Sequence, residues 1–482
     1  MSSKCPARSP RESNNGDGSA EGETVEEVEP VAEGFGGSTV DVPSSSHPPS
    51  FAGVLPEHFV EAVAVEVAVN AARSAGRLAA APAVAAVFQV CSMWRAASQS
   101  ELLWRNLTRR IWTARPRPPS PPSWRDDFVR RHVTAVNFRV RRYAYSRAPP
   151  PSRDLSCCRI ALSDNFIAVG FLDGSVHLFN LPAMHLIANY LPDFLRDRLG
   201  HLSQAISGIV LGSLVDRLTF ASQDGDIRVV NLDYAGLILQ SRTGNVMDDG
   251  TLVDFTGDDR WWVGLFAGVP GRSWQVWNAA TEMLVYVGGN LMDPHAVLGW
   301  HMLTDLSGAA AGRVRMAGPS VAVGCTASSI EVLDLDEMGK ILNRVELPRD
   351  VVVESLNAYE DRLMVVDMQG RVNLCKVPTL QELCRFRAVR RAATAEEGVR
   401  QWDEEAAVVR GCMNWGYVIA YASGRVRVWD AETGQYLYRF RERVGDMIAM
   451  VAGDRYVAAW DNETGLHLWD FGAWLAELVV ED

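Results

Sequence analysis

The sequence lacks the features that mark membrane proteins, secreted proteins and enzymes. None of its 482 residues falls in a run of 18 uncharged apolar residues, so we expect no bilayer-spanning helix. The N-terminus has no apolar signal core, which indicates a cytosolic or nuclear protein. The motifs GxSxG, HExxH, the P-loop and GxGxxG are all missing. We therefore expect no catalytic residues, no cofactor and no enzymatic activity of the chain's own.

Cysteine and histidine are sparse and scattered. The eight cysteines form no CxxC pair and have no histidine at ligand spacing, so reduced thiols in a core are favoured over a metal site or disulfides. The nine histidines also form no cluster, and His177 and His467 occupy polar positions of a repeated strand motif. A solvated or packing role is expected for both.

What the chain does contain is a short motif that occurs seven times. The copies are VHLFN (176–180), IRVVN (227–231), WQVWN (274–278), IEVLD (330–334), VNLCK (372–376), VRVWD (426–430) and LHLWD (466–470). Apolar, polar and aliphatic residues alternate over the first three positions, which is typical of a strand with one face packed on a neighbouring sheet. The copies begin 40 to 56 residues apart, close to the length of a four-stranded propeller blade.

A second apolar strand and a turn precede each copy. Asp173-Gly174 and Asp224-Gly225 are hairpin turn pairs, because glycine adopts positive φ without a Cβ clash. The stretch resembles the WD-repeat family, most clearly at Trp429-Asp430 and Trp469-Asp470. The sequence therefore predicts a mainly β protein whose residues 151–482 form a seven-bladed WD-repeat-like β-propeller.

Charge divides the rest of the chain into three segments. Residues 1–54 are acidic and rich in Ser, Gly, Pro and Glu, so they bury too little apolar surface to fold and should form a disordered tail. Residues 95–147 carry thirteen arginines and three carboxylates. Because the whole chain has a net charge of −12, the propeller that follows must be acidic.

Residues 55–112 are rich in alanine and suited to a small helical domain. The region resembles an F-box in Leu55-Pro56, in Val-Cys-Ser-Met-Trp at 90–94 and in Leu-Leu-Trp at 102–104. The resemblance implies a helical surface that docks on the Skp-type adaptor of a cullin ubiquitin ligase. The residues expected to bind the adaptor are Leu55, Pro56, Phe59, Val63, Val90, Cys91, Trp94, Leu103 and Trp104. A helical domain without that function is the alternative, since 38 residues separate Pro56 and Trp94, more than is usual.

Five motifs between residues 55 and 145 are together similar to the plant sterile apetala family. They are LPEHFVEA, AAAPAVAAVFQVCSMWRA, LWRNLTRRIW, WRDDFVRRH and NFRVRRYAY. The resemblance implies a nuclear regulator of floral organ identity and organ growth that acts as an F-box receptor on a transcriptional regulator. A WD-repeat scaffold that regulates transcription without ligase activity is the alternative function.

The basic segment 113–150 allows three interpretations. It can be a packed linker with its aromatic residues turned inward, which we favour. It can also carry a nuclear-localisation or acidic-partner cluster at Arg130, Arg131, Arg139, Arg141 and Arg142. Direct nucleic-acid binding is the third and least favoured interpretation, because the acidic propeller would oppose it.

The protein substrate should bind at one rim of the propeller, where the turns between the second and third strands of successive blades converge. The residues near these turns that suit a peptide anchor are Phe171, Gln223, Phe266, Tyr421, Arg425 and Trp460. Packing within the blade is the alternative for each of them. The ring itself needs a last outer strand, which either 471–482 or 134–145 can supply. We favour the N-terminal segment.

Overall fold

The computed structural model describes ten stretches of the chain: residues 57–112, 123–152, 155–192, 204–212, 217–232, 238–292, 312–326, 329–348, 351–388 and 409–473. Residues 55–482 form one compact unit. The predicted tail, 1–54, lies outside the described residues, as do Leu55 and Pro56.

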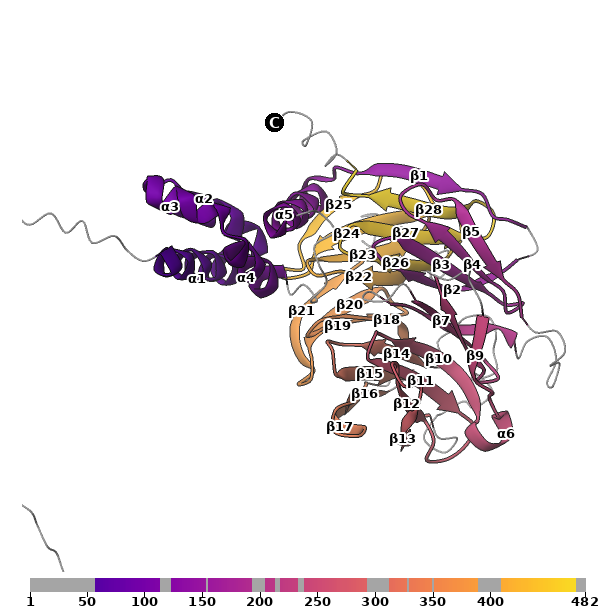
Figure 1. Cartoon of the computed structure of the whole chain (residues 1–482). Coiled ribbons are helices and arrows are strands. Elements are labelled where there is room, and N and C mark those ends of the chain that lie inside the picture. Colours follow the sequence, from indigo (N-terminus) through magenta and orange to yellow (C-terminus); the bar gives the residue numbers. More distant parts are fainter. Residues whose placement is uncertain are drawn as a thin grey trace, which may run out of the picture. The chain divides into compact units, whose positions relative to one another are not determined.

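Helices come first along the chain and are followed by strands (Figure 1). The helical elements are α1 (Glu57–Ala75), η1 (Arg77–Ala79), α2 (Ala80–Phe88), α3 (Ser92–Ala96), η2 (Ala97–Gln99), α4 (Glu101–Trp112), α5 (Trp124–Val140) and the short α6 (Val246–Asp249). In α4, Leu103, Leu107 and Ile111 recur every fourth residue and are buried, as expected for an amphipathic helix. Ser123 caps α5, because its hydroxyl accepts a hydrogen bond from the amide of Asp126 at 3.0 Å.

The described strands form seven four-stranded antiparallel sheets, which confirms the predicted seven-bladed propeller. The first blade consists of β2 (Cys157–Leu162), β3 (Phe166–Phe171), β4 (Val176–Asn180) and β5 (Leu186–Tyr190), and the second of β6 (Ile206–Leu211), β7 (Arg217–Ser222), β8 (Ile227–Asn231) and β9 (Ile238–Arg242). The third blade consists of β10 (Thr251–Gly257), β11 (Trp261–Ala267), β12 (Trp274–Asn278) and β13 (Leu284–Gly288), and the fourth of β14 (Arg313–Met316), β15 (Val321–Cys325), β16 (Ser329–Asp334) and β17 (Lys340–Glu346). The fifth blade consists of β18 (Val353–Tyr359), β19 (Arg362–Asp367), β20 (Arg371–Lys376) and β21 (Gln381–Arg387), and the sixth of β22 (Arg410–Met413), β23 (Tyr417–Ala422), β24 (Arg425–Asp430) and β25 (Tyr436–Arg439). The seven copies of the motif are the third strands of the blades, counted along the chain.

The seventh blade joins the two ends of the propeller. It consists of β26 (Met447–Ala452), β27 (Tyr456–Asp461), β28 (Gly465–Asp470) and, as its outermost strand, β1 (Ala144–Ala148). Figure 1 shows β1 beside β28. The register of the two strands pairs Ala144 with Asp470 and Ala148 with Leu466. The expectation that the N-terminal segment closes the ring is therefore confirmed. The strand itself differs from the predicted 134–145, and the propeller begins at Ala144 rather than at residue 151.

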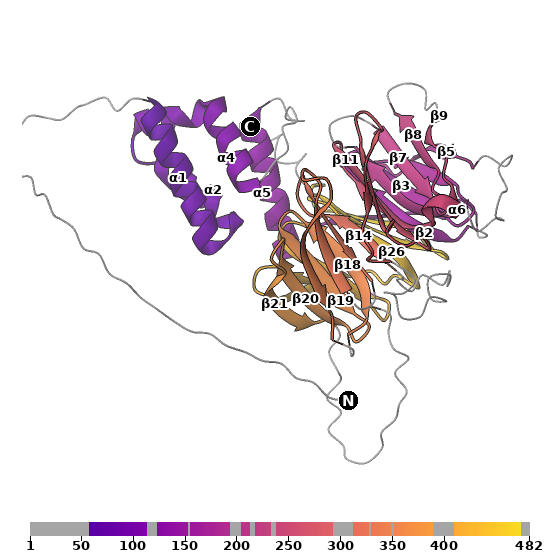
Figure 2. The same cartoon turned by 90° about the horizontal axis from the view of Figure 1, so that it is seen from below.

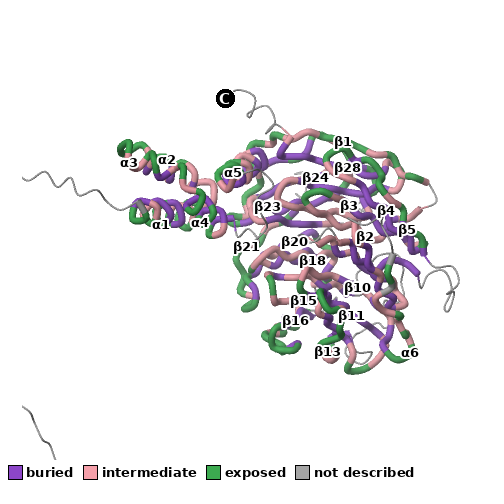
Figure 3. The backbone as a smooth tube through the Cα atoms, in the orientation of Figure 1, coloured by how far each residue is buried: buried purple, intermediate pink, exposed green. Residues whose placement is uncertain are grey.

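The blades pack on one another around a ring of first strands. Each first strand contacts the next, from β2 through β6, β10, β14, β18 and β22 to β26, and β26 contacts β2 (Figure 2). The second and third strands carry most of the buried residues, whereas outer strands such as β17 and β21 are largely exposed (Figure 3). The predicted hairpin glycines behave as expected, since Gly174 has φ of 85° and Gly225 has φ of 86°.

Candidate functional site

The first helix leaves an apolar stripe open to solvent. Phe59, Val63 and Val67 recur every fourth residue and so lie on one face of α1. Phe59 is 47% exposed and Val67 38% exposed, while Val63 is half-buried. The adjoining face of α1 packs completely into the core of the helical region. Two of the predicted adaptor-binding residues, Phe59 and Val63, therefore belong to this stripe, and Val67 extends it.

The turn between α2 and α3 exposes a second apolar site. Val90 is 64% exposed, and the thiol-bearing Cys91 beside it is also exposed. Trp94 in α3 is half-buried and packs against the core of the helical region. The first two residues of the Val-Cys-Ser-Met-Trp sequence are thus exposed to solvent, whereas part of its tryptophan side chain packs on the helical core.

Two predicted adaptor-binding residues are instead core residues. Leu103 is fully buried and Trp104 is 6% exposed. The Trp104 ring lies 5.9 Å from that of Phe88 and 5.3 Å from that of Phe128, and its Nε1 donates to the carbonyl of Ser98 at 2.7 Å. Successive helix positions differ by about 100°, so the exposed side chain of this motif is the preceding residue, Leu102, which is 57% exposed.

The helical region is attached to the propeller by ion pairs and aromatic contacts. Arg77 Nη2 lies 2.8 Å from Glu360 Oε2, and its guanidinium carbon lies 5.3 Å above the ring of Trp415. Trp112 at the end of α4 meets the same tryptophan edge to face, with ring centroids 5.1 Å apart. Glu360 follows β18, and Trp415 lies between β22 and β23. The helices are therefore attached to two different blades.

Helix α5 continues this attachment through the basic segment. Arg131 contacts Asp127 at 3.0 Å and Asp454 at 3.3 Å, and Tyr359 Oη donates to Asp454 at 2.7 Å. Burial raises the pKa of Asp454, and Arg131 opposes that change. Burial alone would lower the pKa of Arg131, but Asp127 and Asp454 raise it. This arginine is thus held inside the protein by two carboxylates.

The other arginines of the predicted cluster have separate roles. Arg130 pairs with Asp127 at 2.5 Å. Arg141 ends α5 in the left-handed conformation with φ of 61°. Arg139 and Arg142 are exposed. Only the last two point into solvent without a structural task in the described residues, so the cluster as a nuclear-localisation or acidic-partner site stays a prediction.

Four of the six predicted rim residues are buried, and we correct their assignment. Phe171 and Trp460 are fully buried, and their rings pack edge to face at 5.3 Å between the first and the seventh blade. Phe266 is 2% exposed and Tyr421 6% exposed. The Tyr421 hydroxyl donates to the carbonyl of Gly445. These aromatic side chains fill the space between blades, so they cannot anchor a peptide without unfolding.

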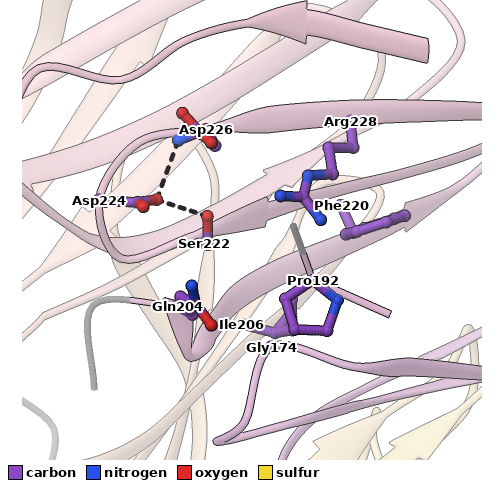
Figure 4. A pocket seen from close by; sticks show the side chains of 9 residues that line it. All are labelled: Gly174, Pro192, Gln204, Ile206, Phe220, Ser222, Asp224, Asp226 and Arg228. Carbon is purple, nitrogen blue, oxygen red and sulfur yellow. Dashed lines mark hydrogen bonds between the residues drawn. The ribbon is translucent and has the colours of Figure 1, made fainter. Parts of the chain in front are cut away.

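The remaining two rim residues, Gln223 and Arg425, are half-buried and reach solvent. A small hollow opens next to Gln223, between Gly174, Gln204 and Arg228 of the first two blades (Figure 4). It holds about 10 Å³ of open space, room for roughly one water molecule. Asp224 in its wall accepts hydrogen bonds from the Ser222 hydroxyl at 2.6 Å and the Asp226 amide at 3.3 Å. The hollow is too small for a substrate.

Neither a group of metal-ligating side chains nor a helix that could cross a membrane is found among the described residues. No group of three or more His, Cys, Asp or Glu side chains in these stretches is placed to hold a metal ion. None of the described helices is long and apolar enough to cross a membrane. The thiols of Cys325 and Cys412 are buried, which raises the pKa of both, that of Cys325 to about 12.

Comparison with known proteins identifies a family for this chain. The chain matches no protein-family model. The computationally designed Ika8 protein has a TM-score of 0.44 and 15% identity, over 67% of this chain and 98% of the designed chain, too low a similarity to bear on function. A curated protein of Arabidopsis thaliana named "Transcriptional regulator STERILE APETALA" is 44% identical over 433 residues, which cover 88% of this chain and 93% of the Arabidopsis protein. The chain therefore belongs to the sterile apetala family.

Proposed function

We propose that this protein is the substrate-receptor subunit of a cullin-type (SCF) E3 ubiquitin ligase. In this proposal α1–α4 dock a Skp-type adaptor, and the propeller captures a transcriptional regulator for degradation. The protein would carry no catalytic residues of its own. The observation that carries the proposal is the set of apolar side chains that α1 and the α2–α3 turn leave in solvent, on helices attached to a propeller.

The exposed side chains are of the kind that interfaces bury. A stripe of apolar residues at every fourth position is how a helix packs into a partner's groove, and Phe59 is the largest side chain of the α1 stripe. A globular domain of this size could have buried Phe59 and Val90 in its own core, as it does with Leu103 and Trp104. Leaving them outside favours a partner that covers them.

The attachment of the helices supports the same function. A ligase receptor must hold the captured protein at a constant position relative to the adaptor, because ubiquitin transfer depends on proximity and orientation. Contacts of Arg77, Trp112 and Arg131 with three blades restrict motion of the helical region. A freely jointed linker between residues 113 and 150 would not provide this restriction.

The name of the Arabidopsis relative supports the choice of captured protein. That relative is described as a transcriptional regulator, and we extend this description to the present chain. We propose a nuclear protein that acts on a regulator of transcription in the control of floral organ identity and organ growth. Direct contact with nucleic acid is not part of the proposal.

A second candidate function follows from the same name, which speaks of transcription and not of ubiquitin. The chain could be a WD-repeat scaffold that recruits a corepressor without ligase activity. The two functions differ in one measurable property, the binding of a Skp-type adaptor to the helical region.

The test uses the full chain, a purified Skp-type adaptor and paired alanine variants. Phe59→Ala with Val90→Ala removes the most exposed apolar side chains of α1 and the α2–α3 turn. Val129→Ala with Val140→Ala is the control, because these two valines of α5 are 45% and 58% exposed but lie outside the proposed interface. Interface truncations at a binding centre cost about 1–2 kcal/mol each, so the first pair should weaken adaptor binding by at least about tenfold and the control should not. Equal effects of the two pairs, or no binding by the wild type, would favour the scaffold.

Partner degradation and partner capture should also separate. Pro56→Ala, at the start of the helical region, should abolish partner degradation but leave capture by the propeller intact. Trp94→Ala is a poorer probe, since Trp94 packs against the helical core and its truncation would also destabilise the domain. If Pro56→Ala and the wild type degrade the partner equally, the ligase role is refuted.

A further inference from the structure

Five arginines gather on the outer part of the sixth blade. They are Arg425 and Arg427 in β24, Arg439 at the end of β25, and Arg441 and Arg443 in the connection to β26. We call this set the arginine edge. Arg427 and Arg439 stand directly opposite each other in the sheet. Two further backbone hydrogen bonds, from Phe440 N to Val426 O at 2.9 Å and from Val444 N to Gly424 O at 3.3 Å, bring the connection alongside the start of β24.

The side chains of the arginine edge face solvent. The buried apolar residues Val426 and Phe440 each lie between two of the arginines along the chain. Arg441 and Arg443 are separated by the half-buried Glu442. Arg439, Arg441 and Arg443 are exposed, and Arg425 and Arg427 are half-buried. Within the described part of the chain, none of the five forms an ion pair with a carboxylate. The one side-chain hydrogen bond among them joins Arg427 Nη1 to the Ala422 carbonyl at 3.4 Å.

The carboxylates that lie nearest in sequence, Glu442 and Asp446, form no ion pair with the arginines in the described residues and so do not neutralise the positive charge of the arginine edge. Glu442 accepts hydrogen bonds from Tyr143 Oη at 3.0 Å and from Trp469 Nε1 at 2.9 Å, so it is engaged with the residue that precedes β1 and with β28. Asp446 is exposed in the same connection. The charge of Arg439, followed by those of Arg443 and Arg427, lowers the pKa of Arg425. The arginines are thus close enough to repel one another.

Mutual repulsion of this kind opposes folding unless something outside the chain offsets it. Like charges directly opposite in a sheet are destabilising, and the chain as a whole carries a net charge of −12. The arginine edge is therefore a local exception on an acidic protein. Arginine presents a planar fork of donors that matches carboxylate and phosphate groups.

We propose that the arginine edge binds an acidic segment of a partner protein, a short stretch that carries aspartate and glutamate or phosphorylated residues. A peptide suits the site better than nucleic acid, because one blade edge contacts only a few anionic groups, whereas a long polyanion would also meet the acidic remainder of the propeller. The inference deepens the proposed function and rests on it for one point, that the partner is the captured regulator.

Binding of labelled peptides to the full chain tests the proposal by fluorescence anisotropy. The probes are an Asp/Glu-rich peptide, a Ser-containing peptide with and without phosphate, a neutral Asn/Gln peptide and a single-stranded oligonucleotide. The variant is Arg439→Gln with Arg443→Gln. The control is Arg260→Gln with Arg385→Gln, which removes the same charge from arginines that pair with Asp336 and Glu382.

The wild type and the control should bind an anionic peptide with an affinity that falls as salt rises. The Arg439/Arg443 variant should bind at least about tenfold more weakly, and the neutral peptide should not bind. The acidic and phosphorylated probes then show which anion is preferred. Equal binding by the variant and the control, or tighter binding of the oligonucleotide than of any peptide, would overturn the proposal. Absence of peptide binding by the wild type would overturn it as well.

Adaptor binding, measured on the same preparations, separates this inference from the proposed function. The Arg439/Arg443 variant should bind a Skp-type adaptor as the wild type does, because the arginine edge lies on the sixth blade and not on α1–α4. Peptide binding without adaptor binding would refute the ligase role and leave the arginine edge as a peptide site. Adaptor binding without peptide binding would support the ligase role and refute the arginine edge as a peptide site.

Discussion

The hydroxyl of Tyr145 and Nδ1 of His467 lie 2.8 Å apart, and this hydrogen bond joins the first strand of the propeller to the last. Tyr145 belongs to β1 and His467 to β28, so the partners stand 322 positions apart in the sequence. The Tyr145 ring also packs against that of Trp469, with centroids 5.7 Å apart. Ring closure therefore depends on contacts of the outermost strand with the strand beside it.

Replacement of residues 144–148 by a Gly-Ser sequence of equal length should lower the melting temperature by more than about 5 °C, since losing several cross-strand pairs costs more than about 2 kcal/mol. The replacement would also expose the edge of β28 to pairing with other molecules. Truncation after Ala473 should have a smaller effect, because β1 and not the C-terminal segment supplies the last strand. Thermal melts of the two variants test this prediction. A larger fall in melting temperature for the truncation than for the replacement would contradict closure by β1.

The closing hydrogen bond should make stability depend on pH. Burial lowers the pKa of His467 below its ordinary value of 6.5, and Nε2 also lies 2.6 Å from the Thr464 hydroxyl. The folded protein therefore binds a proton at this site less readily than the unfolded chain does. The contribution of His467 to stability is therefore largest above pH 6.5 and decreases as the pH falls toward the lowered pKa of the folded protein.

His467→Gln should flatten this pH dependence in melts recorded between about pH 7.5 and about pH 5.5. It should not remove the dependence completely, because burial lowers the pKa of His132 and His177 as well. His185, whose side chain lies in an exposed turn, provides the control substitution His185→Gln. Identical slopes for His467→Gln and the wild type would show that the imidazole does not contribute.

A buried carboxylate should be essential to the ring of first strands. Asp254 is 1% exposed and accepts hydrogen bonds from Arg315 Nη1 at 2.8 Å and from the Val314 amide at 2.9 Å, and Arg159 Nε lies 3.3 Å away. Burial alone would raise the pKa of Asp254, but Arg315 and Arg159 lower it overall. The carboxylate thus connects the first, third and fourth blades.

Asp254→Ala should reduce the free energy of unfolding by about 1–3 kcal/mol, because it leaves the half-buried guanidinium groups of Arg159 and Arg315 without their acceptor. Chemical denaturation measures the loss. In the wild type the contribution of Asp254 is present above its ordinary pKa of 3.8 and disappears as the pH falls through the lowered value. Asp258→Ala is the control, because it removes a half-buried carboxylate of the same blade that accepts hydrogen bonds from backbone amides of its own turn rather than from Arg159 or Arg315. A loss no larger than that of the control would show that Asp254 is not needed to neutralise the arginines.

The fold could be predicted from the sequence because its signals are local. Alternation in motifs such as VHLFN predicted a strand, although the structure buries both faces of β4, and the turn glycines predicted the positive φ found at Gly174 and Gly225. These features depend on neighbours within one blade. Closure of the ring by a segment that precedes the propeller was also predicted correctly. Within the predicted range 134–145, however, residues 134–140 belong to the helix α5, where Asn137 and Phe138 are buried.

The candidate site could be predicted less well, because exposure depends on segments far away in the sequence. Phe171 is buried by Trp460 across the junction of the first and last blades, a contact that no short motif reveals. On α4 the sequence predicted Leu103 as a surface residue, but Leu103 is buried and the exposed residue is its neighbour Leu102. The arginine edge also went unnoticed except for Arg425, since pairing of Arg427 with Arg439 requires the register of β24 and β25.

Trp460→Ala should act on folding rather than on partner recognition. Trp460 is fully buried, its ring packs against Phe171, and its Nε1 donates to Asn462 Oδ1 at 3.1 Å. Truncating a buried tryptophan costs about 3–5 kcal/mol, so the variant should melt well below the wild type. Tyr436→Ala is the control, because Tyr436 is 48% exposed on β25 and its loss should change stability by no more than about 0.5 kcal/mol. If Trp460→Ala melted like the wild type and still lost partner capture, Trp460 would belong to the binding rim after all.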